Sequence, residues 1–206
     1  MPPARKKNPD QDTAARTALL DAAQELMLEE GYAAVSTRKL AAKAGTNSAL
    51  VYYYFGNMDD LFIALFRRGA ERSYERQATA LGSRQPLWGL WDITHDLTST
   101  ALIQEFQALA NHRKAIRAEI AKFSRKFRRM QLDGIKQALA EYGVDSEQWP
   151  AVSVLILMSG ISRFLLVEEE FGVTIGHAET VALVERHIRN LEGERDKALR
   201  KALLSR

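Results

Sequence analysis

The chain has 206 residues, which is enough for one large or two small domains with a sizeable buried core. Apolar residues make up 46% and charged residues 27%, the proportions of an ordinary folded soluble protein. The absence of cysteine excludes disulfides and thiolate chemistry, and it fits a reducing compartment. A formal net charge of +3 permits nucleic acid as a partner without requiring it.

Neither an export signal nor a membrane span is expected. The opening segment, MPPARKKNPDQD, lacks the apolar core of a secretion signal. The most apolar stretch, residues 152–167, is interrupted by serines, a glycine and Arg163, and its length and polarity argue against a bilayer span. These features favour a cytoplasmic protein with no membrane partner.

Helical patterns follow one another along nearly the whole chain. Residues 1–12 are polar, carry three basic residues at positions 5–7, and are predicted to form a disordered basic arm. The first helix begins at about Thr13 and is closed by Gly31. Because we find no convincing alternating strand and no internal repeat, the predicted fold class is all-α.

Three polar residues mark the starts of the next helices. Ser36, Asn47 and Asn57 are natural N-caps. They predict, in that order, helices over residues 37–44, 48–54 and 57–81. Further helices are predicted at about 87–96, 98–110, 113–142, 147–170 and 178–192, followed by a charged tail beyond Gly193. We expect a first domain over residues 13–59 and a larger helical domain over residues 60–206.

The segment from Leu40 to Val51 has the pattern of a helix-turn-helix. Two helices joined by a short turn must cross closely, and Ala41 in the first helix permits that approach. Gly45 can adopt the left-handed backbone conformation of the turn at little steric cost. Leu40 and Val51 then fill the wedge between the helices, so the pattern predicts a motif that can present its second helix to DNA.

The helix over residues 48–54 ends in four successive aromatic residues. A period of 3.6 residues turns Val51, Tyr54 and Phe55 roughly inward, whereas Tyr52 and Tyr53 point outward. For Tyr54, packing and DNA contact both remain open. Small residues at the start of the helix would let it enter a major groove, and tyrosine hydroxyls can donate hydrogen bonds to phosphates. The alternative is that the tyrosines pack against the following helix.

The stretch RTALLDAAQELMLEEGYAAVSTRKLAAKAGTNSALVYYYFGNMDDLFIALF closely resembles the N-terminal domain of the TetR family of transcriptional regulators. This resemblance covers about 50 residues and implies a three-helix DNA-binding domain, a larger ligand-binding and dimerising domain, and repression that a small molecule relieves. It implies a DNA contact set of Thr37, Arg38, Thr46, Asn47, Ser48, Ala49, Leu50, Tyr52, Tyr53 and Tyr54.

Two residues depart from the family pattern. Tyr54 replaces the usual His, which keeps a hydrogen-bond donor but adds bulk. Met58 stands where the family usually has a Lys that binds a phosphate, so one charged contact is missing and DNA binding should weaken. The basic arm at residues 5–7 could compensate for that loss.

The second domain carries two helices suited to a partner chain. Residues 147–170 are apolar nearly all round, which indicates a helix enclosed on every side. In the helix over residues 178–192, a row of apolar residues suits a four-helix dimer seam; the row is Val181, Val184, Ile188 and Leu191. A homodimer through these two helices is favoured over a monomer because a two-fold pair of reading helices matches a palindromic operator.

Residues 111–136 hold nine Lys and Arg against two acidic residues. Along the helix over residues 113–142 an apolar stripe opposes the basic side chains. The simplest interpretation of the basic cluster is a solvated helix face. An anionic ligand site, or contact with an acidic surface, remains open.

The aromatic stretch from Trp88 onward is the expected wall of an effector pocket. Aromatic and aliphatic side chains would line it, and His95, Asp96 or Glu105 could supply polar contacts. The predicted ligand-binding residues are Trp88, Trp91, His95, Phe106, Leu109, Phe123, Phe127 and Met158. Such a pocket would suit a mainly apolar small molecule, although aromatic residues at helical spacing are often only core.

No motif supports catalysis, a metal site or a cofactor. The four histidines lie far apart in the sequence, and there is neither a phosphate-binding glycine loop nor a nucleophile elbow. Two hypotheses therefore remain. The chain is either a ligand-responsive DNA-binding repressor, or a helical ligand- or partner-binding protein whose helix-turn-helix no longer reads DNA.

Overall fold

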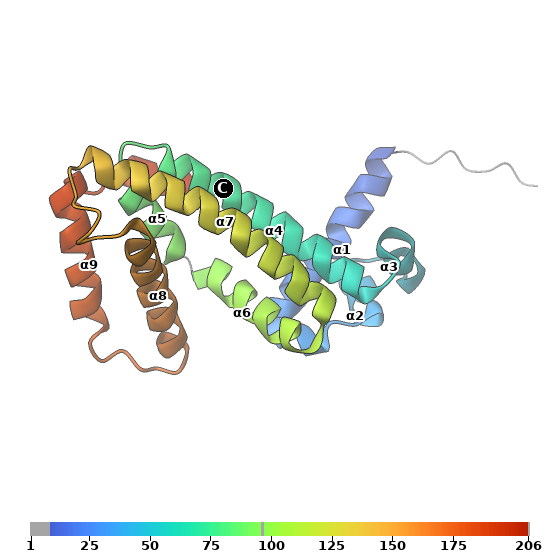
Figure 1. Ribbon diagram of the computed structural model, residues 1–206. Coiled ribbons are helices and arrows are strands. Elements are labelled where there is room, and N and C mark those ends of the chain that lie inside the picture. Colours follow the sequence, from blue (N-terminus) through green and yellow to red (C-terminus); the bar gives the residue numbers. More distant parts are fainter. Residues whose placement is uncertain (1–8, 96, 206) are drawn as a thin grey trace, which may run out of the picture. The chain divides into compact units, whose positions relative to one another are not determined.

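The computed structural model describes residues 9–95 and 97–205, and within these ranges the ordered elements are all helices (Figure 1). The predicted all-α class is confirmed. The helices are α1 (Pro9–Glu30), α2 (Thr37–Lys43), α3 (Ser48–Phe55), α4 (Met58–Leu81), α5 (Pro86–Thr94), α6 (Leu97–His112), α7 (Lys114–Glu141), α8 (Ala151–Glu170), α9 (His177–Glu192) and α10 (Lys197–Leu204), with a 3₁₀ turn at Tyr32–Ala34.

The chain divides into two compact units. The first comprises Met1–Gly69 and Ala101–Ala121, and the second comprises Ala70–Thr100 and Lys122–Arg206. Helices α4, α6 and α7 each contribute residues to both units. The first unit is thus larger than residues 13–59, because it also takes in the start of α4 and a segment of α6 and α7.

The core of the first unit explains this difference. Phe106, Leu109 and Ile116 are buried in the same hydrophobic cluster as residues of α1 to α4. The side chain of Glu105 also accepts a hydrogen bond of 2.6 Å from the backbone N–H of Tyr32. Residues that lie far along the chain therefore complete the core on which the helix-turn-helix rests.

The second unit has its own core, in which α5 is central. Leu87, Trp88, Leu90 and Trp91 of α5 are all buried, together with Ile135 of α7 and residues of α8 and α9. The apolar row predicted as a dimer seam largely belongs to this core as well: Ile188 is buried, and Val181 and Val184 pack against the cluster. Three residues of the row thus face this core, whereas Leu191 is 37% exposed, and the dimer seam itself stays a prediction.

Several element boundaries differ from those expected. Residues 1–8 of the predicted arm lie outside the described residues, and residues 9–12 belong to α1. Helix α8 begins at Ala151 rather than at residue 147, with Pro150 as its N-cap. The expected charged tail contains α10, whose N-cap Asp196 accepts hydrogen bonds from the N–H groups of Ala198 and Leu199.

Helix α8 is long and apolar enough to cross a membrane by length and composition alone, contrary to the sequence-based expectation. The core helix of a soluble protein meets the same criterion. Part of its apolar surface is used inside the second unit, where Leu155, Met158 and Leu166 are buried.

Candidate functional site

The turn between α2 and α3 is built by local hydrogen bonds. The Ser36 hydroxyl accepts from the N–H of Lys39 at 3.4 Å, and the Asn47 side chain accepts from the N–H of Leu50 at 3.2 Å. Both predicted N-caps are therefore confirmed. Gly45 has a φ of +62°, the left-handed conformation that the turn requires.

The two helices meet over a buried wedge. Leu40 and Ala41 of α2 and Val51 and Phe55 of α3 are buried in the first unit's core. This packing fixes the rotation of α3 about its own axis, because an α-helix can bury only one stripe of its surface. The opposite stripe is consequently presented outward.

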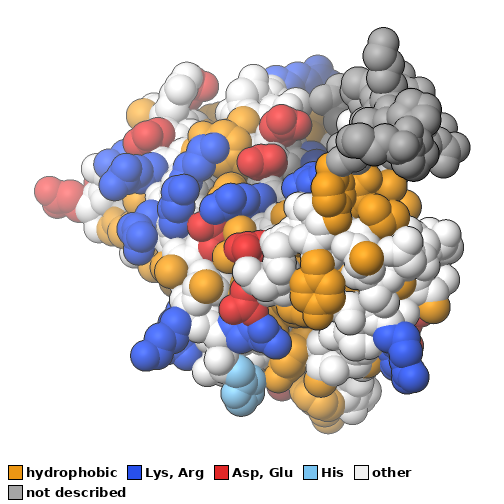
Figure 2. All heavy atoms as spheres, turned by 90° about the vertical axis from the view of Figure 1, so that its right-hand side faces the viewer, with side chains coloured by type: hydrophobic (Ala, Val, Ile, Leu, Met, Phe, Trp, Pro, Cys, Tyr) orange, Lys and Arg blue, Asp and Glu red, His pale blue; other side chains and the backbone are white. Residues whose placement is uncertain are grey.

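That outward stripe carries two phenols. Tyr52 is 56% exposed and Tyr53 is 54% exposed, so more than half of each side chain is accessible. Tyr54 is half-buried and meets the Tyr53 ring edge-on, with 4.9 Å between the ring centroids. Figure 2 shows the side of the molecule on which α3 lies in Figure 1, where hydrophobic and basic side chains both reach the surface.

The remaining predicted DNA contacts come from the same two helices and their turn. Arg38, Asn47 and Ala49 are exposed. Thr37, Thr46, Ser48 and Leu50 are half-buried. None of the ten predicted residues is sealed in the core, and all belong to the segment from Thr37 to Tyr54.

The cations of α2 are not equivalent. Lys39 pairs with Glu30 of α1 at 2.5 Å, and Lys43 pairs with Glu29 at 2.7 Å and with Glu25 at 3.3 Å. The hydrogen bond that Lys43 donates to the Glu29 carboxylate raises the pKa of Lys43. Arg38, in contrast, is exposed and has no ion-pair partner within the described part of the chain.

The start of α4 lacks a basic residue where the family usually has a Lys. Met58 is half-buried and packs against the first unit's core, so it supplies an apolar contact in place of a charge. Asn57 caps the helix by accepting a hydrogen bond of 2.9 Å from the N–H of Asp60, as predicted. Asp59 is paired with Arg113. This corner of the first unit is held by side-chain packing and an ion pair.

The predicted effector residues fall into separate groups. Trp88, Trp91 and Met158 share the second unit's core, and the His95 ring lies against Trp91 at a tilt of 54°, with 3.7 Å between ring centroids. Phe123 and Phe127 lie half-buried along α7. Asp96 lies outside the described residues.

Phe106 and Leu109 do not line an effector pocket of the second unit. Both are buried in the first unit's core, alongside residues of the helix-turn-helix. The prediction assumed that aromatic residues near one another in the sequence line the same wall. Helix α6, however, contributes residues to both units, and Phe106 and Leu109 belong to the first. Their inclusion in the effector set stays a prediction that this packing does not support.

His95 is a polar group beside Trp91 in the second unit. Its Nδ1 lies 2.8 Å from the Ser162 hydroxyl and 3.0 Å from the Trp91 carbonyl oxygen. Burial lowers the pKa of His95. Its Nε2 is buried and has no hydrogen-bond partner among the described residues.

Glu192, at the end of α9, anchors the start of α5. Its carboxylate accepts hydrogen bonds from the N–H groups of Leu87 and Trp88, at 2.8 and 3.0 Å, and from the Tyr142 hydroxyl at 2.8 Å. The carboxylate therefore satisfies donors at a helix N-terminus, where a negative charge is favoured. Burial raises the pKa of Glu192, while the two N–H donors oppose that rise.

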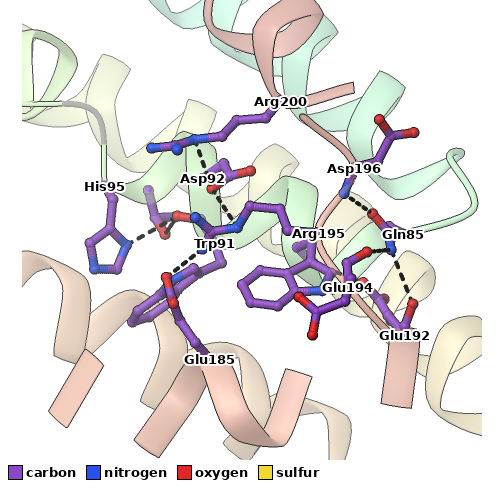
Figure 3. Close-up of polar contacts among 12 residues, drawn as sticks. Gln85, Trp91, Asp92, His95, Glu185, Glu192, Glu194, Arg195, Asp196 and Arg200 are labelled. Carbon is purple, nitrogen blue, oxygen red and sulfur yellow. Dashed lines mark hydrogen bonds and ion pairs between the residues drawn. The ribbon is translucent and has the colours of Figure 1, made fainter. Parts of the chain in front are cut away.

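A second set of polar contacts ties the C-terminal segment to α5 (Figure 3). The Gln85 amide donates to the carbonyl oxygens of Glu192 and Glu194 and accepts from the N–H of Asp196. The buried carboxylate of Asp92 lies 3.6 Å from Arg195 and 3.5 Å from Arg200. Burial raises the pKa of Asp92, and the two guanidinium groups counteract it. The sequence analysis did not predict this network. Asp196 is a typical N-cap residue before a short amphipathic segment, and it could have indicated the helix α10.

The described residues contain no group of three or more His, Cys, Asp or Glu side chains that could hold a metal ion. What they contain is a helix-turn-helix with an outward aromatic stripe, on a core of its own, followed by a larger helical unit. This arrangement combines a helix-turn-helix unit with a second unit made of helices.

Comparison with known proteins identifies the family. Residues 19–65 match the family described as bacterial regulatory proteins, tetR family. The resemblance of the N-terminal segment to this family is confirmed over these residues. Because the family consists of regulatory proteins, the match also agrees with the expectation that the chain is not an enzyme.

Two curated relatives align with the N-terminal part. The chain is 32% identical over 66 residues to the HTH-type transcriptional repressor AcnR of Corynebacterium glutamicum, which covers 32% of this chain and 35% of that protein. It is 36% identical over 58 residues to the fatty acid metabolism regulator protein of Bacillus subtilis, covering 28% and 30% of the two chains. The chain thus matches about a third of each relative's length.

Solved structures share the fold over nearly the whole chain. A transcriptional regulator from Saccharomonospora viridis in complex with choline has a TM-score of 0.68 at 18% identity, and the match covers 86% of this chain and 95% of that one. The regulator FadR from Bacillus subtilis in complex with stearoyl-CoA has a TM-score of 0.64 at 17% identity, covering 87% and 99%. These similarities establish the fold, including the helical second unit.

Proposed function

We propose that the protein is a cytoplasmic, ligand-responsive transcriptional regulator that acts as a dimeric repressor on a palindromic DNA operator. The observation that carries this proposal is the outward stripe of α3, in which Tyr52 and Tyr53 are exposed while Val51 and Phe55 are buried. Burial of one stripe positions the other for a major groove about 12 Å wide. The name of one relative, a repressor, supports the direction of regulation.

The contrast between two cations of α2 tests DNA binding. Arg38→Gln should weaken binding to the DNA upstream of the protein's own gene and reduce the slope of log affinity against log salt by about 0.9 for each phosphate that is no longer neutralised. Lys43→Gln removes the same charge from the same helix, but Lys43 is already engaged by Glu29 and Glu25, so its effect should be smaller. Fluorescence anisotropy at several salt concentrations gives both values. Equal effects of the two substitutions, or none from Arg38→Gln, would contradict the proposed role of Arg38.

The proposed dimer uses α8 and α9. Exposed apolar side chains gather on these two helices; they are Val152, Ile156, Leu157, Phe164, Leu183 and Leu191. A monomer would leave this surface in water, whereas a two-fold partner would cover it with the same surface of a second copy. Two copies of α3 could then read half-sites about 34–36 Å apart, or a multiple of that distance.

The effector is proposed to be a mainly apolar small molecule bound in the second unit near Trp91, His95 and Met158. The unsatisfied Nε2 of His95 could orient a polar group of such a ligand. A structural neighbour bound to stearoyl-CoA, which carries a long apolar chain, lends support. Helices α4, α6 and α7 belong to both units, so a change in the second unit can reach the first. A ligand that binds better to one arrangement of the dimer can then shift the population away from the arrangement that binds the operator. A shift of ~10²–10⁴-fold in operator affinity would need about 2.7–5.5 kcal/mol of differential binding.

A second candidate function rests on Met58. With an apolar residue packed at that position, the helix-turn-helix has one phosphate-binding charge fewer, and the protein would instead bind only a ligand or a partner protein. Under this alternative, substitutions at Arg38, Thr37 or Tyr53 leave every measurable activity unchanged. The salt-dependent DNA binding of the Arg38 and Lys43 variants separates the two functions.

A further inference from the structure

A basic hollow lies between α4 and α7, within the second unit. Its volume is about 630 Å³. One side is formed by Tyr74 of α4, and the other residues lie on α7; the complete lining is Tyr74, Lys122, Arg125, Lys126, Arg129, Met130 and Asp133. Four cations therefore face one hollow that contains a single carboxylate.

The four cations form one continuous row. Arg125, Lys126 and Arg129 follow Lys122 by three, four and seven residues. This spacing places side chains on the same face of a helix. Like charges at these separations destabilise a helix. None of the four forms an ion pair within the part of the chain that the structure describes, and all are exposed. Solvation of a helix face alone gives no reason for four positive charges to border one concave surface.

Contacts between α4 and α7 fix the hollow. A Cβ at Gly134 would lie 2.9 Å from a methyl carbon of Leu81, so the two helices approach closely at that point. The Gln131 amide donates to the Gln77 side chain at 2.7 Å. Tyr74 is held by an edge-on contact with Phe127, with 5.5 Å between ring centroids. The wall opposite the cations is thus positioned before any ligand arrives.

The Tyr74 ring also orients one of the cations. The Lys126 ammonium lies over this ring, 4.0 Å from its centroid. A cation held on an aromatic face keeps its charge directed into the hollow and loses less conformational freedom when an anion binds. Tyr74 and Met130 add apolar surface beside the charges, which suits a ligand that is anionic without being wholly polar.

From this geometry we infer that the hollow binds a small molecule carrying two or more phosphate groups in a row. Seven residues of α-helix separate Lys122 from Arg129, a rise of ~10 Å. One phosphate cannot reach both ends of that row, whereas a di- or triphosphate chain can contact several cations at once. Guanidinium groups bind phosphate oxygens in a bidentate manner, and Arg125 and Arg129 supply two of them.

The size of the hollow favours a small molecule over a macromolecule. Its volume falls within the range of about 300–1,000 Å³ that small-molecule sites occupy. The site lies entirely in the second unit and does not depend on whether α3 reads DNA. Duplex DNA is nevertheless a competing occupant, because a row of cations also attracts its backbone.

Inorganic tripolyphosphate is the probe that tests the site on the full-length protein. Isothermal titration at low ionic strength should show binding that weakens as salt is added, and orthophosphate should bind at least about tenfold more weakly. The double variant Arg125→Gln/Arg129→Gln should lose at least about tenfold in tripolyphosphate affinity. The matched control is Arg128→Gln/Lys136→Gln, which removes two exposed cations of α7 that do not line the hollow; it should stay within about threefold of the unaltered protein.

A second readout guards against loss of the fold. Tripolyphosphate should raise the melting temperature of the unaltered protein and of the control, but not that of the Arg125/Arg129 variant, whose own melting temperature should not fall because the removed charges repel each other. Three results would overturn the inference: no binding of tripolyphosphate, an equal loss in both double variants, or an Arg125/Arg129 variant that loses affinity only for non-specific duplex DNA.

Discussion

Replacing Phe164 by Glu is expected to leave the chain folded but monomeric, and to abolish its binding to operator DNA. Phe164 is 60% exposed on α8, so the substitution removes little internal packing. In a two-fold interface it introduces one charge from each copy into the same apolar surface, and desolvating those charges costs several kcal/mol. Dimer affinity should fall at least about a hundredfold, which corresponds to about 2.7 kcal/mol. Sedimentation equilibrium and DNA binding measured on the same sample give both results.

The control for this substitution is Leu204→Glu. Leu204 is also an exposed apolar residue of the second unit, but it lies on α10, which is not one of the two helices of the proposed interface. This variant should remain dimeric and bind DNA normally. A dimer that survives Phe164→Glu, or that is lost equally in both variants, would contradict the assignment of α8 and α9 to the interface.

Glu192→Ala is expected to cause the largest loss of folding stability, about 2–4 kcal/mol. The substitution removes one carboxylate that accepts three hydrogen bonds, two from the N-terminus of α5 and one from Tyr142. Truncation leaves these partly buried donors without an acceptor, and the positive end of the α5 dipole loses its counter-charge. Chemical denaturation followed by circular dichroism measures the change in the free energy of unfolding.

Glu194→Ala serves as the matched control two residues further on. The Glu194 side chain is 83% exposed, and its ion pair with Arg189 lies at the surface. Because exposed ion pairs contribute about 0–1 kcal/mol, this variant should be nearly as stable as the unaltered protein. Similar stabilities for the two variants would show that the Glu192 carboxylate does not hold α5 in place.

The local features of the helix-turn-helix could be predicted from the sequence because they depend on neighbouring residues. Ser36 and Asn47 cap their helices through hydrogen bonds that span three residues, and Gly45 adopts a backbone conformation set by steric freedom alone. The periodicity of a single helix was enough to separate the buried Val51 and Phe55 from the exposed Tyr52.

Features that depend on distant partners could not be predicted in this way. The apolar face of α6 was visible in the sequence, but nothing in its spacing shows that Phe106 packs against the helix-turn-helix rather than lining a pocket. The short helix α10 is too weak to form alone and is held by the cap at Asp196 and by packing of Leu203. The basic row on α7 was recognised as a charge excess, and only the position of Tyr74 shows that it borders a hollow.

Binding of the protein to the DNA upstream of its own gene, compared with binding by the Tyr53→Ala variant, tests the role of α3 most directly. Tyr53 is more than half exposed, so its truncation should leave the melting temperature nearly unchanged. We expect a specific complex with two protein chains per DNA fragment, and at least about a tenfold loss of affinity in the variant. If the unaltered protein binds this DNA no better than unrelated duplex, or if the variant binds it equally well, α3 does not read an operator there.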